Sequence, residues 1–332
     1  MDVKQKILVV KLSSLGDVLH ALPAVAELKR QLKAEIHWAV QPGFSTLVRC
    51  FSCVDEVIEV PRPRLNKAYS AALRQIRSTS YDMVVDFQGL LKSAVIARAA
   101  RAPRRIGPSF AREGSSFFYH ELAGSKNKNR HAIDECLDVI SHLGLEMPSK
   151  PTFPMNVPDV DFEDLIAELP YHGPLIAVAP SSRWESKNWP EEHFAELLGN
   201  IVRKHDARVC IIGGAGDNDV ALRIIEASGV KAVSFCGRHS IVQSLGVLAK
   251  CEALVSNDSG PMHMAVALGV KAVVPFGPTL PERTGPYGPG HAPIHVAVCE
   301  PCRKRVCPLG TKACMYGVTP AMVEAALFGA DK

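Results

Sequence analysis

The stretch KILVVKLSSLGDVLHALPAVAELKRQL, residues 6–32, joins a short apolar run to a helical pattern through a polar turn. The run at 6–10 is rich in β-branched residues and predicts a buried strand. The apolar residues after the turn keep the spacing of one helix face, and they are Val18, Leu22, Val25, Leu28 and Leu32. The stretch therefore predicts a strand–turn–helix unit, the building block of a parallel sheet.

The same alternation continues along both halves of the chain. Predicted strands lie at 6–10, 35–40, 56–60, 82–86, 175–179, 208–212, 232–235, 253–256 and 272–276. Predicted helices in the second half lie at 190–204, 218–227, 240–249 and 261–268. Strands that alternate with helices form parallel sheets covered on both faces. We expect an α/β protein with two Rossmann-like domains that face each other across a cleft.

A proline-rich segment, KPTFPMNVPDVDF at 150–162, interrupts this alternation and indicates a linker. The length of 332 residues also favours two domains. We expect an N-terminal domain at 1–150 and a C-terminal domain at 151–319. A closing helix is expected within 320–332, and the sequence leaves open whether it packs back on the N-terminal domain.

Composition and charge narrow the class of protein. Apolar residues make up 47% of the chain, yet no apolar run reaches the roughly 18 residues of a membrane-spanning helix. The first residues show no signal-peptide pattern, so we expect a cytoplasmic protein. Residues 1–150 carry 22 Lys and Arg against 15 Asp and Glu, which is either scatter or a surface for an anionic partner. The excess is too small, with too few interleaved aromatic residues, for a nucleic-acid-binding protein.

The segment VSNDSGPMHMAVALG, residues 255–269, is the strongest candidate for a binding loop. A strand ends, a polar turn follows, and a proline stands where a helix should begin. The free N–H groups of that helix start can bind an anion, with Ser259, Gly260 and His263 beside it. The alternative is that Asp258 or Ser259 only caps the helix and His263 is a surface residue.

A second polar loop, in APSSRWESKNWPEEHF at 179–194, follows another strand. Its hydroxyls, Ser181 and Ser182, can donate to phosphate oxygens, and Lys187 can neutralise a pyrophosphate. The alternative is a solvent-exposed capping loop with a scattered lysine.

Asp17 follows the first strand and has two competing interpretations. As a general base it would take a proton from a hydroxyl held opposite the anion site. As a helix cap it would accept N–H bonds, which makes a carboxylate a poorer base. Gly16 permits a tight turn that could aim the Asp17 side chain outward.

Weaker candidates follow other strands. The loop IIGGAGDNDVA at 211–221 lacks the third glycine of a dinucleotide motif, so NAD chemistry has little support. Asp217 or Asp219 in this loop could lie near ribose hydroxyls. Asp86, Gln88 and Lys92 follow the strand at 82–86 and are candidates for the cleft, although Lys92 can equally be a solvated helix residue.

Four segments together resemble a known family. KLSSLGDVLHALPA, DFQGLLKSA, the Ser-Ser…Lys loop before NWPEEHF, and SNDSGPMHMAVALGVKAVVPFGPT recur in this order in the ADP-heptose:lipopolysaccharide heptosyltransferases of glycosyltransferase family 9. The form KLSSLGDVLH is more similar to heptosyltransferase I than to II. The family fold is GT-B, with two Rossmann-like domains. The alternatives are heptosyltransferase II or another nucleotide-sugar GT-B enzyme, a transferase for a different sugar or an epimerase.

The resemblance implies a function for most of these candidates. Asp17 matches the base of a single inverting displacement that needs no metal or other cofactor. The acceptor would be the Kdo-bearing lipid A of the lipopolysaccharide inner core, at the cytoplasmic face of the inner membrane. Candidate acceptor residues are Arg62, Arg64 and Lys67. The implied residues for ADP-heptose are Ser181, Ser182, Lys187, Asp258, Ser259, Gly260 and His263.

One motif is not explained by this resemblance. CEPCRKRVCPLGTKAC places thiols at Cys299, Cys302, Cys307 and Cys314, a spacing that could hold a structural zinc ion or an iron–sulfur cluster. Free thiols, or a disulfide formed on purification, are the alternatives.

Overall fold

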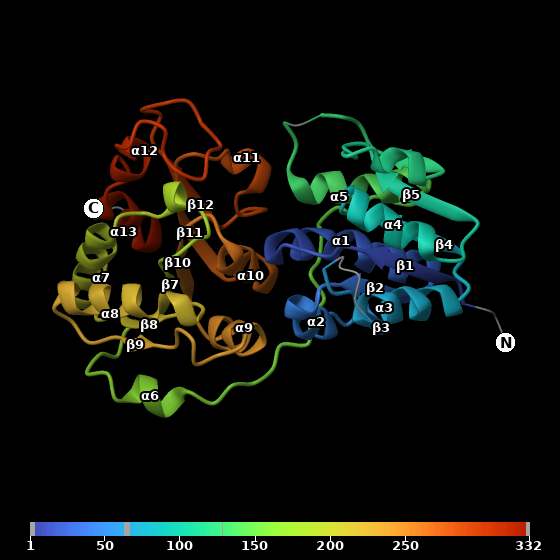
Figure 1. Ribbon diagram of the computed structural model, residues 1–332. Helices are drawn as coiled ribbons and strands as arrows, with labels where there is room; N and C mark the ends of the chain where they lie inside the picture. Colours follow the sequence, from blue (N-terminus) through green and yellow to red (C-terminus); the bar gives the residue numbers. More distant parts are fainter. Residues whose placement is uncertain (1–3, 63–66, 128, 330–332) are drawn as a thin grey trace. The chain divides into compact units, whose positions relative to one another are not determined.

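The computed structural model describes residues 4–62, 67–127 and 129–329. The chain divides into two compact units, with the boundary between Asn156 and Val157 (Figure 1). Each unit contains one parallel six-stranded sheet with helices packed on it. The chain is therefore an α/β protein with two sheets in series.

The first unit is built on a sheet of strand order β3-β2-β1-β4-β5-β6. Its strands are β1 (Lys6–Val10), β2 (Glu35–Val40), β3 (Glu56–Glu59), β4 (Met83–Asp86), β5 (Arg104–Pro108) and β6 (Glu121–Ala123). Its helices are α1 (Leu15–Leu32), α2 (Pro42–Arg49), α3 (Lys67–Ser78), α4 (Leu91–Ala99) and α5 (Ala132–His142), with a 3₁₀ turn η1 (Ser115–Phe118).

The central strand β1 is covered on both faces. Leu8 and Val10 belong to a buried cluster with α3 and α4 residues such as Ile76 and Ile96. Ile7 and Val9 point to the opposite face and are also fully buried. Burial on both faces explains why this strand has no polar alternation in its sequence.

The second unit repeats the arrangement, with strand order β12-β11-β10-β7-β8-β9. Its strands are β7 (Leu175–Ala179), β8 (Arg208–Ile211), β9 (Val233–Ser234), β10 (Ala253–Ser256), β11 (Lys271–Phe276) and β12 (Ala292–His295). Its longer helices are α7 (Glu191–His205), α8 (Asn218–Ser228), α9 (Ile241–Ala249), α10 (Gly260–Leu268) and α13 (Pro320–Phe328). Shorter helical segments are α6 (Glu163–Ala167), η2 (Glu185–Lys187), η3 (Ala215–Asp217), α11 (Pro281–Thr284) and α12 (Ala313–Tyr316).

The closing helix α13 packs on the core of the second unit. Val323 and Leu327 join the buried cluster of that unit, together with residues of α7 and β11. Glu324 is bonded to Lys204 at 2.9 Å and His205 at 3.2 Å, both on α7. The apolar face of this helix thus belongs to the core of the second unit.

Three strands were absent from the sequence-based prediction, and all lie towards sheet edges. They are β5 (RRIGP), β6 (ELA) and β12 (APIH). Each is short, and charges or prolines replace the β-branched runs on which the prediction depended. The predicted core strands agree with the structure to within one residue at each end.

Within the described part of the chain, no helix combines the length and apolar character needed to cross a membrane.

Candidate functional site

The second unit has a switch in strand order between β7 and β10. β8 and β9 follow β7 towards one edge, whereas β11 and β12 follow β10 towards the other. The loops that leave β7 and β10 therefore separate at the carboxyl end of the sheet. Ligands of open parallel sheets bind at this point. In the second unit, this switch point is formed by the loop 180–189 and by the start of α10. We call these two segments the switch loops.

Lys187 and Asp258 join the two switch loops by a buried ion pair. Lys187 Nζ lies 2.6 Å from Asp258 Oδ2, and the two side chains are 16% and 5% exposed. Thr279 Oγ1, in the loop after β11, donates to the same carboxylate oxygen at 2.7 Å. The ion pair thus holds a lysine at the switch point, beside the start of α10.

Asn257 fixes the backbone of both loops. Its Nδ2 donates to the carbonyl of Pro180 at 2.5 Å, and its Oδ1 accepts from the N–H of Trp189 at 2.9 Å. Asn257 is fully buried. Sequence reasoning missed Asn257 and Thr279 as site residues, although both lie inside the quoted segment SNDSGPMHMAVALGVKAVVPFGPT.

The start of α10 is not capped by the side chain of its N-cap residue. Ser259 is the N-cap residue in extended conformation, but its side chain makes no cap hydrogen bond. Gly260 is the first helical residue, Pro261 follows it, and His263 is half-buried in the same turn. A helix start whose cap side chain leaves the N–H groups open, next to a lysine, suits a phosphate.

The two serines after β7 have different surroundings. The Ser182 hydroxyl donates to the carbonyl of Trp184 at 2.8 Å, and the Ser182 N–H donates to Asn188 Oδ1 at 2.8 Å. Ser182 therefore shapes the loop, and its hydroxyl would have to leave Trp184 to donate to a phosphate. Ser181 is half-exposed at the end of the strand.

The first unit has its own switch point, between β1 and β4. Asp17 lies here, in the first turn of α1, and its Oδ2 accepts from the N–H and the hydroxyl of Ser14 at 2.9 and 2.7 Å. Its Oδ1 lies 4.0 Å from Lys11 Nζ, and its side chain is 45% exposed. The carboxylate thus braces the helix start and still reaches solvent at the carboxyl end of the sheet. Gly16 is helical rather than part of a tight turn, which corrects the role predicted for it.

Gln88 ties the loops after β1 and β4 together. Its Oε1 accepts from the N–H groups of Leu12 and Ser13, both at 3.2 Å. Lys11 Nζ also donates to the carbonyl of Phe87 at 2.8 Å. Gln88 therefore positions the loop that precedes Asp17. Lys92 is half-exposed on α4.

Asp86 is held inside the first unit. Its side chain accepts from the hydroxyl of Tyr119 at 2.7 Å and from the N–H groups of Gln88 at 2.7 Å and Gly89 at 3.2 Å. Burial raises the pKa of Asp86, and these bonds oppose the rise. The carboxylate therefore anchors the loop after β4, which differs from the cleft position predicted for it.

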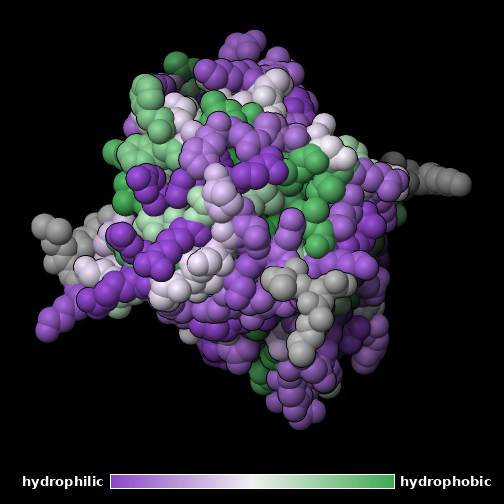
Figure 2. All heavy atoms as spheres, turned by 90° about the vertical axis from the view of Figure 1, so that its right-hand side faces the viewer, coloured by the Kyte–Doolittle hydropathy of each residue, from purple (hydrophilic) through white to green (hydrophobic). Residues whose placement is uncertain are grey.

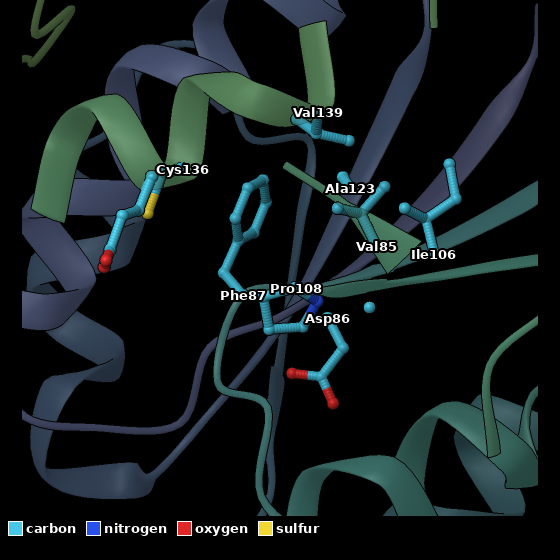
Figure 3. A pocket seen from close by; sticks show the side chains of 10 residues that line it. Val85, Asp86, Phe87, Ile106, Pro108, Ala123, Cys136 and Val139 are labelled. Carbon is cyan, nitrogen blue, oxygen red and sulfur yellow. The ribbon is translucent and has the colours of Figure 1, made fainter. Parts of the chain in front are cut away.

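A small pocket lies beside Asp86, between β4, β5 and α5 (Figure 3). Cys136 and Val139 of α5 face Phe87 across it, while the carboxylate of Asp86 points away from Cys136 (Figure 3). With about 10 Å³ of free volume, the pocket has room for about one water molecule. This pocket is too small for a sugar or a nucleotide.

The remaining candidates lie apart from the switch points. Asp217 accepts from the N–H of Gly214 at 2.8 Å and so closes the glycine loop after β8, and Asp219 is exposed in the first turn of α8. Arg62 and Lys67 are exposed, and Arg64 lies outside the described residues.

The four cysteines of the C-terminal motif, for which the sequence left a metal site and free thiols open, are not assembled as a metal site in the described part of the chain. Across the described residues, no three His, Cys, Asp or Glu side chains converge as a metal site requires. Cys299 contacts Cys314, and backbone N–H groups around the sulfur, that of Lys312 first, lower the pKa of the Cys307 thiol. The backbone between Cys302 and Cys307 is bonded instead to Pro278 and Ser186.

Comparisons with known proteins found a matching family model and several curated relatives. The family model for glycosyltransferase family 9 (heptosyltransferase) matches residues 70–313. Lipopolysaccharide heptosyltransferase 1 of Pseudomonas aeruginosa is 30% identical over 318 residues, covering 91% of this chain and 87% of that protein. Lipooligosaccharide heptosyltransferase 2 of Campylobacter jejuni is 26% identical over 320 residues, covering 93% of each.

Two solved structures share the fold. The E. coli heptosyltransferase WaaC with ADP has a TM-score of 0.73 and 27% identity, with 87% of this chain and 92% of that chain covered. E. coli ADP-heptose heptosyltransferase II has a TM-score of 0.76 and 21% identity, with 97% and 98% covered. At that identity the second likeness concerns the fold alone.

Proposed function

Because the chain belongs to glycosyltransferase family 9, the heptosyltransferases, we propose that it transfers L-glycero-D-manno-heptose from ADP-heptose to the Kdo-bearing inner core of lipopolysaccharide. Four relatives named lipopolysaccharide heptosyltransferase 1 are 29–30% identical to it, and three named heptosyltransferase 2 are 26–27% identical. These identities favour type I. One structural relative was solved with ADP-2-deoxy-2-fluoro heptose, at a TM-score of 0.74 and 26% identity.

The observation that carries the donor assignment is the Lys187–Asp258 pair beside the open start of α10. A lysine and free helix N–H groups are what a diphosphate needs in order to bind without a divalent cation. Ser181, Gly260 and His263 lie on the same switch loops and complete the proposed site for the ADP-sugar. Asp258 orients the lysine rather than contacting the diphosphate, since like charges repel.

Asp17 is the proposed base. Its Oδ1 takes the proton of an acceptor hydroxyl, whose oxygen attacks the anomeric carbon of the heptose. The new carbon–oxygen bond forms as the bond to the diphosphate breaks, and ADP leaves with the electron pair. A single displacement of this kind inverts the anomeric centre. Ser14 fixes the other carboxylate oxygen, so the side chain is oriented before the acceptor arrives.

The test is Asp17→Asn with Asp164→Asn, an exposed carboxylate on α6, as control. The amide keeps the shape and can still accept from Ser14, but it cannot take the proton. We expect unchanged ADP binding and a transfer rate to Kdo2-lipid A that falls about 10²–10⁴-fold. The read-out is product mass after incubation with ADP-heptose. Near-wild-type turnover in Asp17→Asn would reject the base assignment.

Substrate panels separate the alternatives. An acceptor that already carries heptose, used in preference to Kdo2-lipid A, indicates heptosyltransferase II. Thermal stabilisation by UDP but not by ADP indicates a nucleotide-sugar enzyme of another specificity.

We further propose that the protein works as a peripheral protein at the cytoplasmic face of the inner membrane, where its lipid-borne acceptor lies. Apolar side chains stand out from the first unit: Leu91 and Val95 on α4 are 42% and 38% exposed, and Phe117 on η1 is 92% exposed. Arg98 on α4 is exposed, and so is Arg112, which lies three residues before η1. On the face of the molecule drawn in Figure 2, hydrophobic areas lie among hydrophilic ones. Apolar side chains with adjacent cations suit an anionic lipid surface.

Vesicle sedimentation tests this surface. Burying one large apolar side chain contributes about 2 kcal/mol, so Phe117→Ser is expected to weaken binding to anionic vesicles about tenfold or more. The control is Leu222→Ser on α8 of the second unit, which removes a side chain that is 53% exposed. Equal binding by the two variants would refute the proposed surface. If the wild type binds zwitterionic and anionic vesicles equally well, the arginines have no role in binding the membrane.

A further inference from the structure

The segment 299–312, which carries the unexplained cysteines, is bonded to the switch loops. The N–H of Ser186 donates to the carbonyl of Arg305 at 3.0 Å, and the Ser186 hydroxyl donates to the carbonyl of Lys304 at 2.5 Å. The N–H of Arg303 donates to the carbonyl of Pro278 at 2.9 Å, one residue before Thr279. Ser186 is only 2% exposed. Three consecutive basic residues are thus fixed by their backbone to the elements that hold the Lys187–Asp258 pair.

Trp184 brings two cations to one ring. Lys187 Nζ lies 4.9 Å from the centroid of the Trp184 ring, and the guanidinium carbon of Arg305 lies 6.0 Å from it. Both distances fall at or within the range at which an aromatic face attracts a cation. The guanidinium of Arg305 is therefore positioned by a specific contact beside the lysine of the proposed donor site, although Arg305 itself is exposed.

The charge balance at the proposed donor site favours a second cation beside Lys187. Lys187 is paired with Asp258 at 2.6 Å, so the pair has no net charge. A diphosphate carries negative charge on both of its phosphates, and the charge grows on the leaving oxygen as the sugar departs. The helix start supplies only a partial positive charge, about half an elementary charge. A planar guanidinium with a forked set of donors matches phosphate oxygens.

We propose that Arg305 is a further donor-binding residue, which contacts the diphosphate of the nucleotide-sugar from its place on the Trp184 ring. This inference rests on the proposed function. It also gives the cysteine-rich segment a role: the segment carries a cation to the donor site. Lys304 and Arg303 add to the local field, but only the charged end of Arg305 is placed by a ring contact within the described residues.

The experiment measures Kd for ADP and for adenosine by titration calorimetry with the wild type, Arg305→Gln and Lys304→Gln. Each variant loses one positive charge, and the two positions are adjacent and exposed. Comparing them therefore distinguishes a direct contact of Arg305 with the diphosphate from a general effect of the positive charge of this segment. We expect Arg305→Gln to weaken ADP binding about tenfold or more, Lys304→Gln to weaken it about twofold or less, and neither to change adenosine binding. Arg305→Lys should recover only part of the affinity.

Two outcomes would overturn the inference while leaving the proposed function in place. One is wild-type ADP affinity in Arg305→Gln, and the other is an equal loss in both variants. If the wild type itself binds neither ADP nor ADP-heptose, the proposed function fails, and the role of Arg305 fails with it. Circular dichroism of each variant checks that the fold is intact.

Discussion

Replacing Lys187 with methionine removes the charged partner of a buried carboxylate and keeps most of the length of the side chain. In the wild type, Oδ2 of Asp258 accepts from Lys187 Nζ at 2.6 Å and from Thr279 Oγ1 at 2.7 Å. The Asp258 side chain is 5% exposed. In Lys187→Met the carboxylate keeps the Thr279 hydroxyl and loses its counter-ion.

The size of the effect follows from this burial. Removing one partner of a buried ion pair costs roughly 3–5 kcal/mol. We expect Lys187→Met to lower the free energy of unfolding by about 3 kcal/mol, the lower end of this range. The reason is that water reaches part of Lys187 and that Thr279 still donates to Asp258. For a unit of this size, Tm falls by about 2–4 °C per kcal/mol, so the loss corresponds to about 6–12 °C. The double variant Lys187→Met/Asp258→Asn should recover most of it, since a neutral amide needs no counter-ion.

The assay is urea unfolding followed by tryptophan fluorescence, in which Trp184 and Trp189 report on the second unit. The control is Arg223→Met, which breaks an exposed ion pair with Glu191, whose two side chains are 56% and 44% exposed. An exposed pair contributes at most about 1 kcal/mol. If Lys187→Met costs no more than this control, or if the double variant is no more stable than the single one, water screens the pair and the reasoning from burial is wrong.

Two further predictions concern packing and pH. A Cβ atom at Gly107 would lie 2.1 Å from the Tyr119 ring, so Gly107→Ala should lower the free energy of unfolding by about 2–3 kcal/mol through overpacking. A Cβ atom at Gly43 in α2 would have nothing within 4 Å, so Gly43→Ala should raise the free energy of unfolding by about 0.5–1 kcal/mol. Comparable urea midpoints for these two variants would contradict the packing argument. Burial tends to raise the pKa of Glu324, but bonds led by that from Lys204 outweigh it, so the pKa lies below its ordinary value of 4.5. A depressed pKa stabilises the fold at higher pH, and this stabilisation is lost as the pH falls from about 4.5 through the lowered pKa. Thermal unfolding of Glu324→Gln should accordingly depend less on pH in this range than that of the wild type, and parallel curves for the two proteins would exclude the effect.

Much of the site could be predicted because it follows strands that are obvious in the sequence. The segments 179–194 and 255–269 each combine a continuous apolar run with a polar loop and a proline at a helix start, and these are local signals. The structure places both loops at one switch point and joins them through Lys187 and Asp258. The bonds of Asp258 Oδ2 to Lys187 and Thr279 were not visible in the sequence, because they join three separate loops.

Other parts could not be predicted, because they depend on partners far along the chain. Asp86 looked like a residue of the cleft, but its carboxylate is bound by Tyr119, 33 residues away. The cysteine spacing left a metal site and free thiols open, and it gave no sign that the backbone of this segment bonds to Ser186, which is 118 residues from Lys304. A spacing shows which ligands are near one another in sequence, but not how the backbone between them is held.

The sequence by itself determined the alternation of strands and helices, the α/β class and the polar loops that follow the strands, because these depend on the periodicity of neighbouring residues. Only the tertiary structure decided that β7 lies beside β10, that α13 packs on the second unit, and that Arg305 lies on the Trp184 ring. Strand order and contacts between distant loops are set by the packing of whole elements on a sheet. No local pattern of side chains contains that information.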